Sequence, residues 1–467
     1  MSSKKGTATK LKLPEGEQRI PKDIQTNVVD FLQKYSEKGK KYRTKGIDFA
    51  PISILAGISN LYLNKKYKTN CYMYGSKVKE FIHGGFKIVF LTEQIPSITD
   101  EFLTNFIREN KNQITIFLNC IKNNNPVIII PLGLIFPGGG HHANMLIYKR
   151  ALNTIEHFEP HGSSFETNPD YGDKIKTILE ALVTEINTVK RKPLYSIQGL
   201  GDISFVPSDQ VCPRSRGLQA IQEELKKSSI EQGEYCQMWS FLFAELALLN
   251  PTMTSGDIMS EFFEMIETKD GAQELTDVIR GYVSILGEEI STYLSEYINN
   301  AFTIENISYI FSINLNYANY LAKMLEDIIF FEVNAEMLVS QQQPKPTIPQ
   351  LEADETTLKN QLLNYFIAQQ QVKELVIHRL CNYTSQDTKR IDVEINNKLQ
   401  LELQEYRQNI GYIDRYIKNK VLKNFLITKQ SSEAKSRPKT VKKGGKKYKK
   451  RKLSKTKKNR RSRKHKR

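Results

Sequence analysis

The stretch from Cys236 to Leu249 is apolar on every side when it is written as a helix. Glu245 is its only charged residue, and Asn250-Pro251 ends it. A helix without a polar face has to be covered by other elements all round, so it lies inside a core and not on a surface. The chain therefore has to fold around a central helix that begins with a cysteine.

A strand-rich region precedes this helix. Val127–Ile130 is a short, fully apolar run of β-branched residues, which predicts a buried strand. After the glycines at 138–140, His142–Lys149 and Thr154–Phe158 are separated by a short turn and predict an antiparallel hairpin. These strands are the partners that we expect to cover the central helix.

Helical periodicity dominates the rest of the chain. Apolar residues at helical spacing predict helices over Asp23–Tyr35, Ser97–Cys120, Asp173–Val189, Asp257–Ile266, Glu274–Leu294, Ile307–Leu338 and Leu358–Leu380. Pro193–Phe205 favours a further strand region, and residues 341–353 form a Pro/Gln-rich linker. With 467 residues, the chain is long enough for about two or three domains.

The predicted fold class is α+β, with a small mixed sheet packed on the buried helix. Residues 1–20 are a polar, flexible leader, and residues 21–251 form the sheet-containing domain, with its core motifs at 126–251. Residues 252–430 are a mostly helical region, and residues 431–467 are a disordered basic tail.

The net charge of +17 belongs to the tail alone. Lys435 to Arg467 hold 20 Lys and Arg and no acidic residue, whereas the rest of the chain carries 48 basic and 51 acidic residues. Such a block repels itself and binds polyanions through counterion release, with strong salt dependence and no base readout. Residues 435–467 therefore predict nucleic-acid binding, and they resemble nuclear localisation signals.

The five cysteines are far apart, odd in number and without CxxC spacing. They are Cys71, Cys120, Cys212, Cys236 and Cys381. This pattern argues against a disulfide framework and a cysteine-based zinc site, and it favours a reducing compartment. Met1–Leu13 has no apolar core of a secretory signal, and the longest apolar run, Val127–Phe136, is too short to span a membrane. We expect no membrane partner.

Cys236 is the candidate nucleophile, because it opens the central helix. The unpaired N–H groups at a helix N-terminus favour a thiolate and can bind the oxyanion of an acyl-transfer intermediate. A base must reach the sulfur and a third group must orient the base, and His142 with Glu159 can supply both. The alternative is that Cys236 is a small buried hydrophobic residue, as most cysteines in apolar helices are.

The segment from His142 to Gly162, taken with Cys236, resembles the adenain-type superfamily of cysteine peptidases. This superfamily contains the adenovirus-type endopeptidases and the SUMO- and ubiquitin-like-protein-specific proteases. In it, a histidine opens one strand, an acidic residue ends the next, and the cysteine starts a central helix; here 17 residues separate His142 from Glu159, the interval expected. The resemblance implies a papain-like or adenain-like fold and thiol-dependent hydrolysis by a Cys-His-Glu triad, without a cofactor or a metal.

A closer resemblance is to proteins of giant DNA viruses, and it covers roughly residues 126–251. The shared segments are His142–Tyr148, Phe158–Gly162, Cys212-Pro213, Gly217-Leu218-Gln219 with Glu223, Cys236-x-x-Trp239-Ser240 and Asn250-Pro251. It implies viral precursor proteins or ubiquitin-like conjugates as substrates. It also implies that the protein is located in the virion, the viral factory or the host cytoplasm. The basic tail could in addition direct the protein to the nucleus.

The chain departs from the family pattern at several positions. Ala143 stands where many members have Trp, and Tyr235-Cys236-Gln237 stands where many have Asp-Cys-Gly. The resemblance also implies a glutamine that completes the oxyanion hole. We assign it to Gln219, which lies 17 residues before the cysteine, with Gln222 and Gln232 as alternatives; His141 is likewise an alternative to His142.

Two other interpretations use the same residues. His157, Glu159 and His161 alternate along a strand and could bind zinc together with His142, although no HExxH spacing is present. Alternatively, the protein is a catalytically inactive, nucleic-acid-binding virion protein that keeps the peptidase fold as a scaffold.

Overall fold

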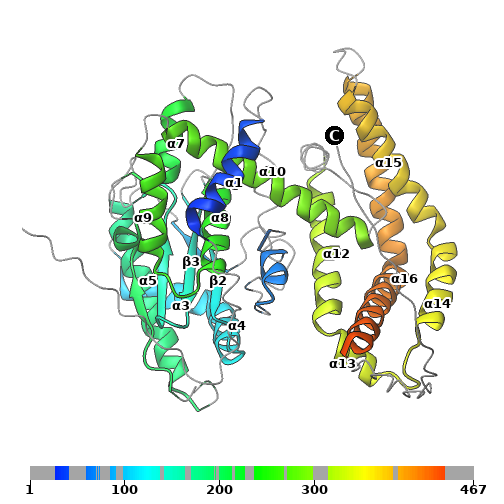
Figure 1. The fold of residues 1–467 in the computed structure, drawn as a ribbon, viewed down its shortest axis with the longest axis horizontal. Coiled ribbons are helices and arrows are strands. Elements are labelled where there is room, and N and C mark those ends of the chain that lie inside the picture. Colours follow the sequence, from blue (N-terminus) through cyan, green and yellow to red (C-terminus); the bar gives the residue numbers. More distant parts are fainter. Residues whose placement is uncertain are drawn as a thin grey trace, which may run out of the picture.

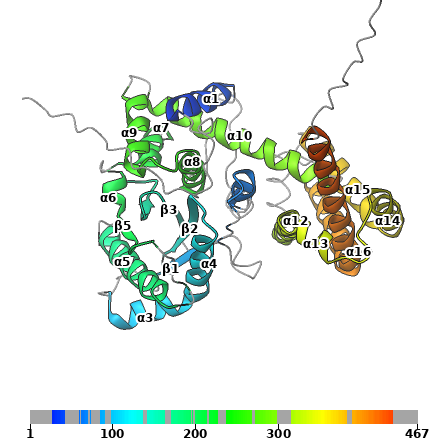
Figure 2. The same cartoon turned by 60° about the horizontal axis from the view of Figure 1, so that its bottom comes forward.

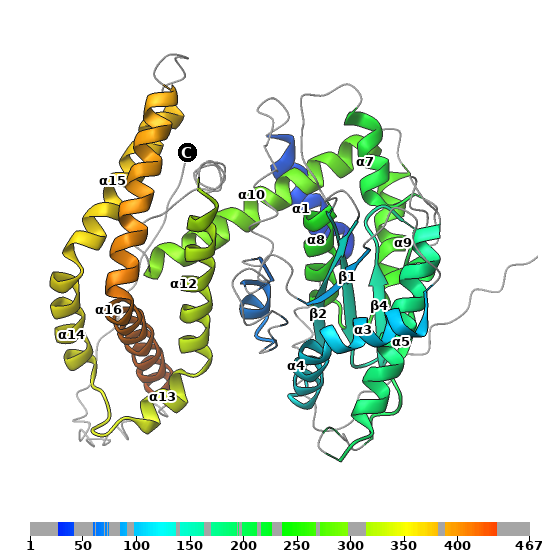
Figure 3. The same cartoon turned by 180° about the vertical axis from the view of Figure 1, so that it is seen from behind.

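The computed structural model describes residues 27–41, 59–60, 62–69, 71, 73, 85–90, 98–136, 141–162, 170–193, 195, 199–212, 216–226, 236–267, 271–297, 314–381 and 388–436. The chain forms two lobes, one with all the described strands and one of helices alone, which we call the sheet lobe and the helical lobe (Figure 1). Helix α10 (Gly271–Tyr297) runs from the first lobe to the second, as the view from behind also shows (Figure 3).

The sheet lobe is built on one five-stranded mixed sheet. Its strands are β1 (Phe86–Val89), β2 (Val127–Ile135), β3 (His141–Lys149), β4 (Thr154–Phe158) and β5 (Ser204–Val206), in that spatial order. The pairs β2–β3 and β3–β4 are antiparallel, whereas the edge strands β1 and β5 pair parallel to their neighbours. The predicted hairpin is confirmed as β3 and β4.

Both faces of this sheet are buried, which explains why β2 is apolar at consecutive positions. Side chains at Ile129, Met145 and Ile147 pack toward helix α8 (Cys236–Leu249), where the rings of Phe158 and Phe243 stack with centroids 4.0 Å apart. The opposite face of the sheet packs against a second set of helices, and its buried side chains include Ile128, Ile130, Leu146 and Tyr148.

The helices cover the two faces as separate layers (Figure 2). One layer holds α3 (Asp100–Glu109), α4 (Lys111–Lys122) and α5 (Asp170–Lys190). On the α8 side lie α1 (Val28–Lys40), α6 (Ser208–Val211), α7 (Leu218–Lys226) and α9 (Ser255–Ile266). Thr99 caps α3 by accepting a hydrogen bond from the Phe102 amide. All but one of the α8 side chains are buried, as its sequence requires.

Helices α1 and α10 cross at two glycines. A Cβ added to Gly281 would lie 1.9 Å from the Tyr35 carbonyl oxygen, and one added to Gly39 would lie 1.7 Å from the Asp277 carbonyl oxygen. Only residues without a side chain allow the two backbones to approach this closely. Since α10 also contacts α7, α8 and α9, the packed unit extends beyond the predicted boundary at residue 251.

The helical lobe contains α12 (Leu315–Val333), α13 (Ala335–Gln341), α14 (Ile348–Gln361), α15 (Leu363–Cys381) and α16 (Thr388–Ser436). The long helix α16 packs against the other four. The predicted linker at 341–353 is shorter in the structure, because α14 begins at Ile348 with a proline in its first turn, where no amide hydrogen is needed. The disordered tail was predicted to begin at residue 431, but helix α16 continues to Ser436. Residues 437–467 and the leader at 1–20 lie outside the described residues.

Two further sequence predictions differ from the structure. Among the described residues of the strand region predicted at Pro193–Phe205, only Ser204 and Phe205 belong to a strand, β5. Cys71 and Cys120 form a disulfide with a Cα–Cα distance of 5.2 Å, whereas the cysteine spacing argued against a disulfide framework and favoured a reducing compartment. The fold brings together two cysteines 49 residues apart, and spacing along the chain carries no information about that. Cys212 and Cys236 are buried and are not part of this disulfide. No helix in the described ranges is long and apolar enough to cross a bilayer.

A buried ion pair anchors the segment that follows α8. Lys149, on β3, is fully buried, and its Nζ lies 3.3 Å from Oε2 of Glu156 and donates to the Met253 carbonyl. The same carboxylate accepts hydrogen bonds from the Ser255 amide at 2.8 Å and the Thr154 hydroxyl at 3.0 Å. These contacts hold the start of α9, and with it the end of α8, on the sheet.

Candidate active site

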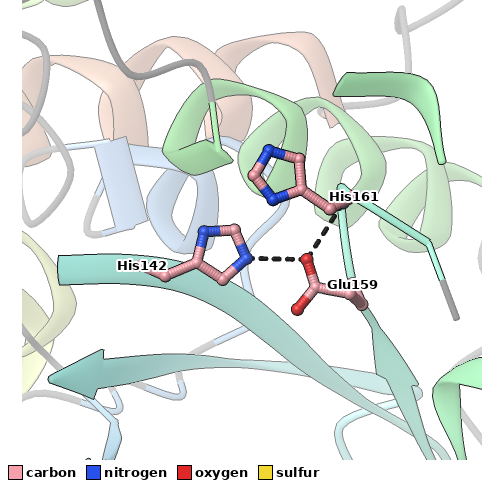
Figure 4. A group of neighbouring side chains, drawn as sticks. All are labelled: His142, Glu159 and His161. Carbon is pink, nitrogen blue, oxygen red and sulfur yellow. Dashed lines mark hydrogen bonds and ion pairs between the residues drawn. The ribbon is translucent and has the colours of Figure 1, made fainter. Parts of the chain in front are cut away.

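The hairpin brings His142 and Glu159 together where its two strands separate. Register pairing between β3 and β4 stops at Met145 and Phe158, so the residues beyond are not tied by the ladder. Across this gap, Nε2 of His142 lies 2.6 Å from Oε1 of Glu159 (Figure 4). Both side chains are buried, at 8% and 2% exposed. A short charge-assisted hydrogen bond in a dry site is among the stronger contacts available to an imidazole.

Glu159 is held by the turn that follows it. The His161 amide donates to the same Oε1 at 2.9 Å, and the Gly162 amide donates to the Glu159 carbonyl at 3.1 Å. Gly162 has a φ of 101°, in the left-handed region that favours glycine. The carboxylate therefore has a fixed orientation, as a residue that orients a base requires.

Cys236 is brought to this pair by the first turn of α8. Ser240, one turn after the cysteine, donates from its hydroxyl to the Ala143 carbonyl at 3.1 Å, and Ala143 directly follows His142. The buried Cys236 thiol lies close enough to the His142 imidazole for hydrogen bonding between them to raise the pKa of that imidazole. Because Nε2 faces Glu159, Nδ1 is the ring nitrogen left for the sulfur. Glu159, His142 and Cys236 thus form a continuous chain.

Electrostatics in the pair favour a charged imidazole next to a carboxylate. Burial on its own would lower the pKa of His142, but the Glu159 carboxylate and the hydrogen bond to Cys236 outweigh it and hold this pKa well above its ordinary value. Burial would raise the pKa of Glu159, but His142 and the His161 amide hold it below its ordinary value. The buried environment therefore stabilises the imidazolium that forms when His142 accepts a proton from the neighbouring thiol, with an ionised Glu159 beside it.

Gln219 lies on a segment that is hydrogen bonded to the same turn. Its amide donates to the Pro160 carbonyl at 3.0 Å, and the Gly217 amide donates to the His161 carbonyl at 2.6 Å. A Cβ at Gly217 would lie 2.4 Å from both the Gly162 nitrogen and the Pro160 oxygen, so this approach requires glycine. The segment resembling Gly-x-Gln therefore lies against the turn that carries Glu159.

The two alternatives to Gln219 were Gln222 and Gln232. Oε1 of Gln222 accepts a hydrogen bond from the Trp239 indole at 2.8 Å, so Gln222 holds α7 to α8 in the core. Gln232 lies outside the described residues, as does the side chain of His141. Among the described glutamines that were candidates, Gln219 is the one whose backbone is attached to the site.

His157 does not join the other histidines. Its Nε2 lies 2.8 Å from the Asn144 amide nitrogen, and burial lowers its pKa to about 4, so it is neutral and accepts this hydrogen bond. His161, by contrast, places its ring parallel to that of His142, with centroids 4.9 Å apart (Figure 4). The four residues weighed for a zinc site thus separate into a cluster of His142, Glu159 and His161 and a separate His157.

Sequence reasoning missed the contacts that join these elements. The hydrogen bond between Asn144 and His157 is a tertiary contact, and so is the hydrogen bond by which Ser240 anchors α8 on β3. Ser240 stood inside the Cys236-x-x-Trp239-Ser240 motif, so its place one helical turn after the cysteine was the available signal.

Comparisons with known proteins give one distant relative of viral origin. The chain is 24% identical over 212 residues to an ankyrin repeat protein of Acanthamoeba polyphaga mimivirus, which covers 42% of this chain and 26% of that protein. The chain therefore spans about a quarter of that relative's length. No protein-family model matches the chain, and no solved structure matches it.

Proposed function

We propose that this protein is an adenain-type cysteine peptidase that hydrolyses peptide or isopeptide bonds with Cys236, His142 and Glu159. The observation that carries the proposal is the buried chain from carboxylate to imidazole to thiol, at the N-terminus of an otherwise apolar helix. Thiol acyl transfer needs a nucleophile in contact with a base, and a third group that orients the base.

The reaction runs in two halves. The Cys236 sulfur, its proton taken by His142, attacks the scissile carbonyl carbon, and the resulting oxyanion is held by N–H groups at the start of α8. His142 then gives its proton to the leaving amine, and a thioester remains on Cys236. Water, deprotonated by His142, attacks this thioester, and the carboxylic acid leaves as the thiol is restored.

Two further residues have supporting roles in this mechanism. Glu159 fixes the imidazole orientation and stabilises its positive charge, which fits the 2.6 Å contact and the amide bond from His161. Gln219 is the residue that we propose as a second oxyanion donor, beside the Cys236 amide. Its attachment to the Pro160 turn supports this role.

The substrates that we propose are viral precursor proteins or ubiquitin-like conjugates, in the virion, the viral factory or the host cytoplasm. The resemblance to adenain-type enzymes supports the substrate class, and the likeness to a mimivirus protein supports the viral setting.

Hydrolysis can be tested without a known substrate. The purified chain is incubated with a proteome-derived peptide library, and new N-termini are mapped by mass spectrometry. We expect a recurrent cleavage motif with wild type and none with Cys236→Ala. The matched control is Cys212→Ala, which removes a second buried cysteine outside the disulfide and should keep the motif. Equal cleavage by Cys236→Ala would refute the proposal.

We also propose that residues 435–467 attach the protein to nucleic acid. The tail has 20 basic and no acidic residues, which is the composition for sequence-independent phosphate binding. Deleting the tail should weaken binding to random double-stranded DNA at least ~100-fold at low salt, and wild-type affinity should fall steeply between 50 and 200 mM salt, by roughly 10³-fold or more. Anisotropy titrations measure both, and salt-independent binding would contradict the proposal.

A further inference from the structure

We propose that His142, Glu159 and His161 form a binding site for a single Zn²⁺ ion, which reversibly blocks the imidazole of His142. The binding of zinc stands on the geometry alone, whereas its inhibitory effect rests on the proposed peptidase function. The site would let the availability of zinc decide when the enzyme is active.

The three side chains already converge. One ligand atom from each lies within 4.8 Å of the others, and the cluster comes from two neighbouring parts of one hairpin. Figure 4 shows the two imidazole rings side by side, with the Glu159 carboxylate facing both. Two imidazoles and one carboxylate are a ligand set found in zinc sites that keep one position open.

A second observation points to a ligand at Glu159. Its other carboxylate oxygen, Oε2, is buried and has no hydrogen-bond partner within the described part of the chain, although the side chain is only 2% exposed. A buried, unsatisfied carboxylate oxygen is costly and calls for an ion or a polar group. A metal bound through both carboxylate oxygens of Glu159 would satisfy it.

The site needs only small side-chain movements to accept the ion. Nε2 of His142 and Oε1 of Glu159 are 2.6 Å apart, whereas two ligands on a tetrahedral zinc are roughly 3.3 Å apart for bonds of about 2.0 Å. Rotations about the side-chain bonds supply the difference. His157 stays out of the site because Asn144 holds its ring.

Zinc binding would disable the proposed base directly. The metal takes a lone pair of the His142 imidazole and of the Glu159 carboxylate, and any proton on that imidazole is released to water. The ring is then fixed on the ion, and it can neither accept the thiol proton nor return it to a leaving amine. No bond is made or broken covalently, so removal of the ion restores the site.

Calorimetric titration of ZnCl₂ into the metal-free full-length chain tests the binding. Cys236→Ala serves as the parent, so that the thiol does not contribute. We expect one site, with affinity at least ~100-fold lower after His161→Phe or Glu159→Gln, since each removes a direct ligand. His378→Gln, a histidine in the helical lobe, is the matched control and should leave the site unchanged. Circular dichroism recorded for each variant shows whether it folds, and His161→Phe keeps an aromatic ring at that position.

The inhibitory half is read separately, as hydrolysis of the mapped cleavage motif by wild type with and without ZnCl₂ and after addition of a chelator. Loss with zinc and recovery with the chelator support the inference. Zinc binding that is the same in the parent and in both folded ligand variants would overturn it. Hydrolysis that persists at saturating zinc would overturn the inhibitory role, whereas a chain that binds zinc and never cleaves peptides would refute the peptidase proposal alone.

Discussion

Replacement of His142 by alanine should lower kcat/KM for peptide hydrolysis by at least ~10³-fold, with the fold retained. Without the imidazole, no described group is in hydrogen-bond contact with the Cys236 thiol to take its proton or to return one to the leaving amine. The peptides that wild type cleaves provide the assay, and initial rates give kcat/KM.

Glu159→Gln separates orientation from proton transfer in the same assay. A glutamine cannot stabilise the imidazolium, although it can still accept the His161 amide bond. We expect a loss smaller than that of His142→Ala, of about 10- to 1,000-fold, mainly in kcat, because the ring remains while its charge is no longer balanced. The account would be contradicted if His142→Ala, still folded, kept more than a tenth of wild-type kcat/KM.

Exchange of Lys149 for methionine should lower the free energy of unfolding by about 3–5 kcal/mol. Methionine fills a similar volume but leaves the Glu156 carboxylate buried, with its cationic partner gone. An unpaired buried charge costs far more than the net value of the pair itself, since the desolvation of the remaining ion is no longer offset. Urea unfolding, followed by the fluorescence of the single tryptophan, Trp239, measures the loss.

The double variant Lys149→Met with Glu156→Gln is the control for this prediction. Glutamine at position 156 is neutral, so no unpaired buried charge remains, and its side chain can still accept the hydrogen bond from the Ser255 amide. The double variant should therefore be more stable than Lys149→Met alone. If Lys149→Met loses less than about 1 kcal/mol, the carboxylate is not held as a buried ion and the anchoring role of this pair is wrong.

The central helix and the hairpin were predictable because their signals are local. The apolar circumference of Cys236–Leu249 requires a buried helix, and the short turn between two apolar runs requires neighbouring strands. The 17-residue interval then places His142 and Glu159 near the open end of this hairpin, beyond the last register pair of Met145 with Phe158. The central helix and the hairpin with its two site residues are each encoded within one continuous segment of the chain, so local sequence patterns were enough to predict them.

The remaining features depend on contacts between distant segments, and no local pattern encodes them. The edge strands β1 and β5 are short and pair parallel to strands far along the chain, so they give little periodicity. The Cys71–Cys120 disulfide joins two segments whose proximity only the packed lobe defines. Gly281 is unremarkable within a helical pattern, and its role appears only when α1 crosses it.

The separation of His157 from the zinc-type cluster has the same origin. On alternation alone, His157, Glu159 and His161 share a face, but the strand ends at Phe158 and the chain turns at Pro160. Asn144 then binds the ring of His157, whereas His161 stacks on His142. A polar partner on the neighbouring strand, which the sequence does not reveal, decides which histidines meet.

The alkylation rate of Cys236, resolved by mass spectrometry under native conditions with a small iodoacetamide probe, tests the central claim most directly. The claim is that the sulfur is activated by His142, so we predict that Cys236 reacts at least ~10-fold faster than Cys212 in wild type and loses this advantage in folded His142→Ala. If Cys236 reacts no faster than Cys212, or reacts equally fast without His142, the thiol and the imidazole are not a working pair.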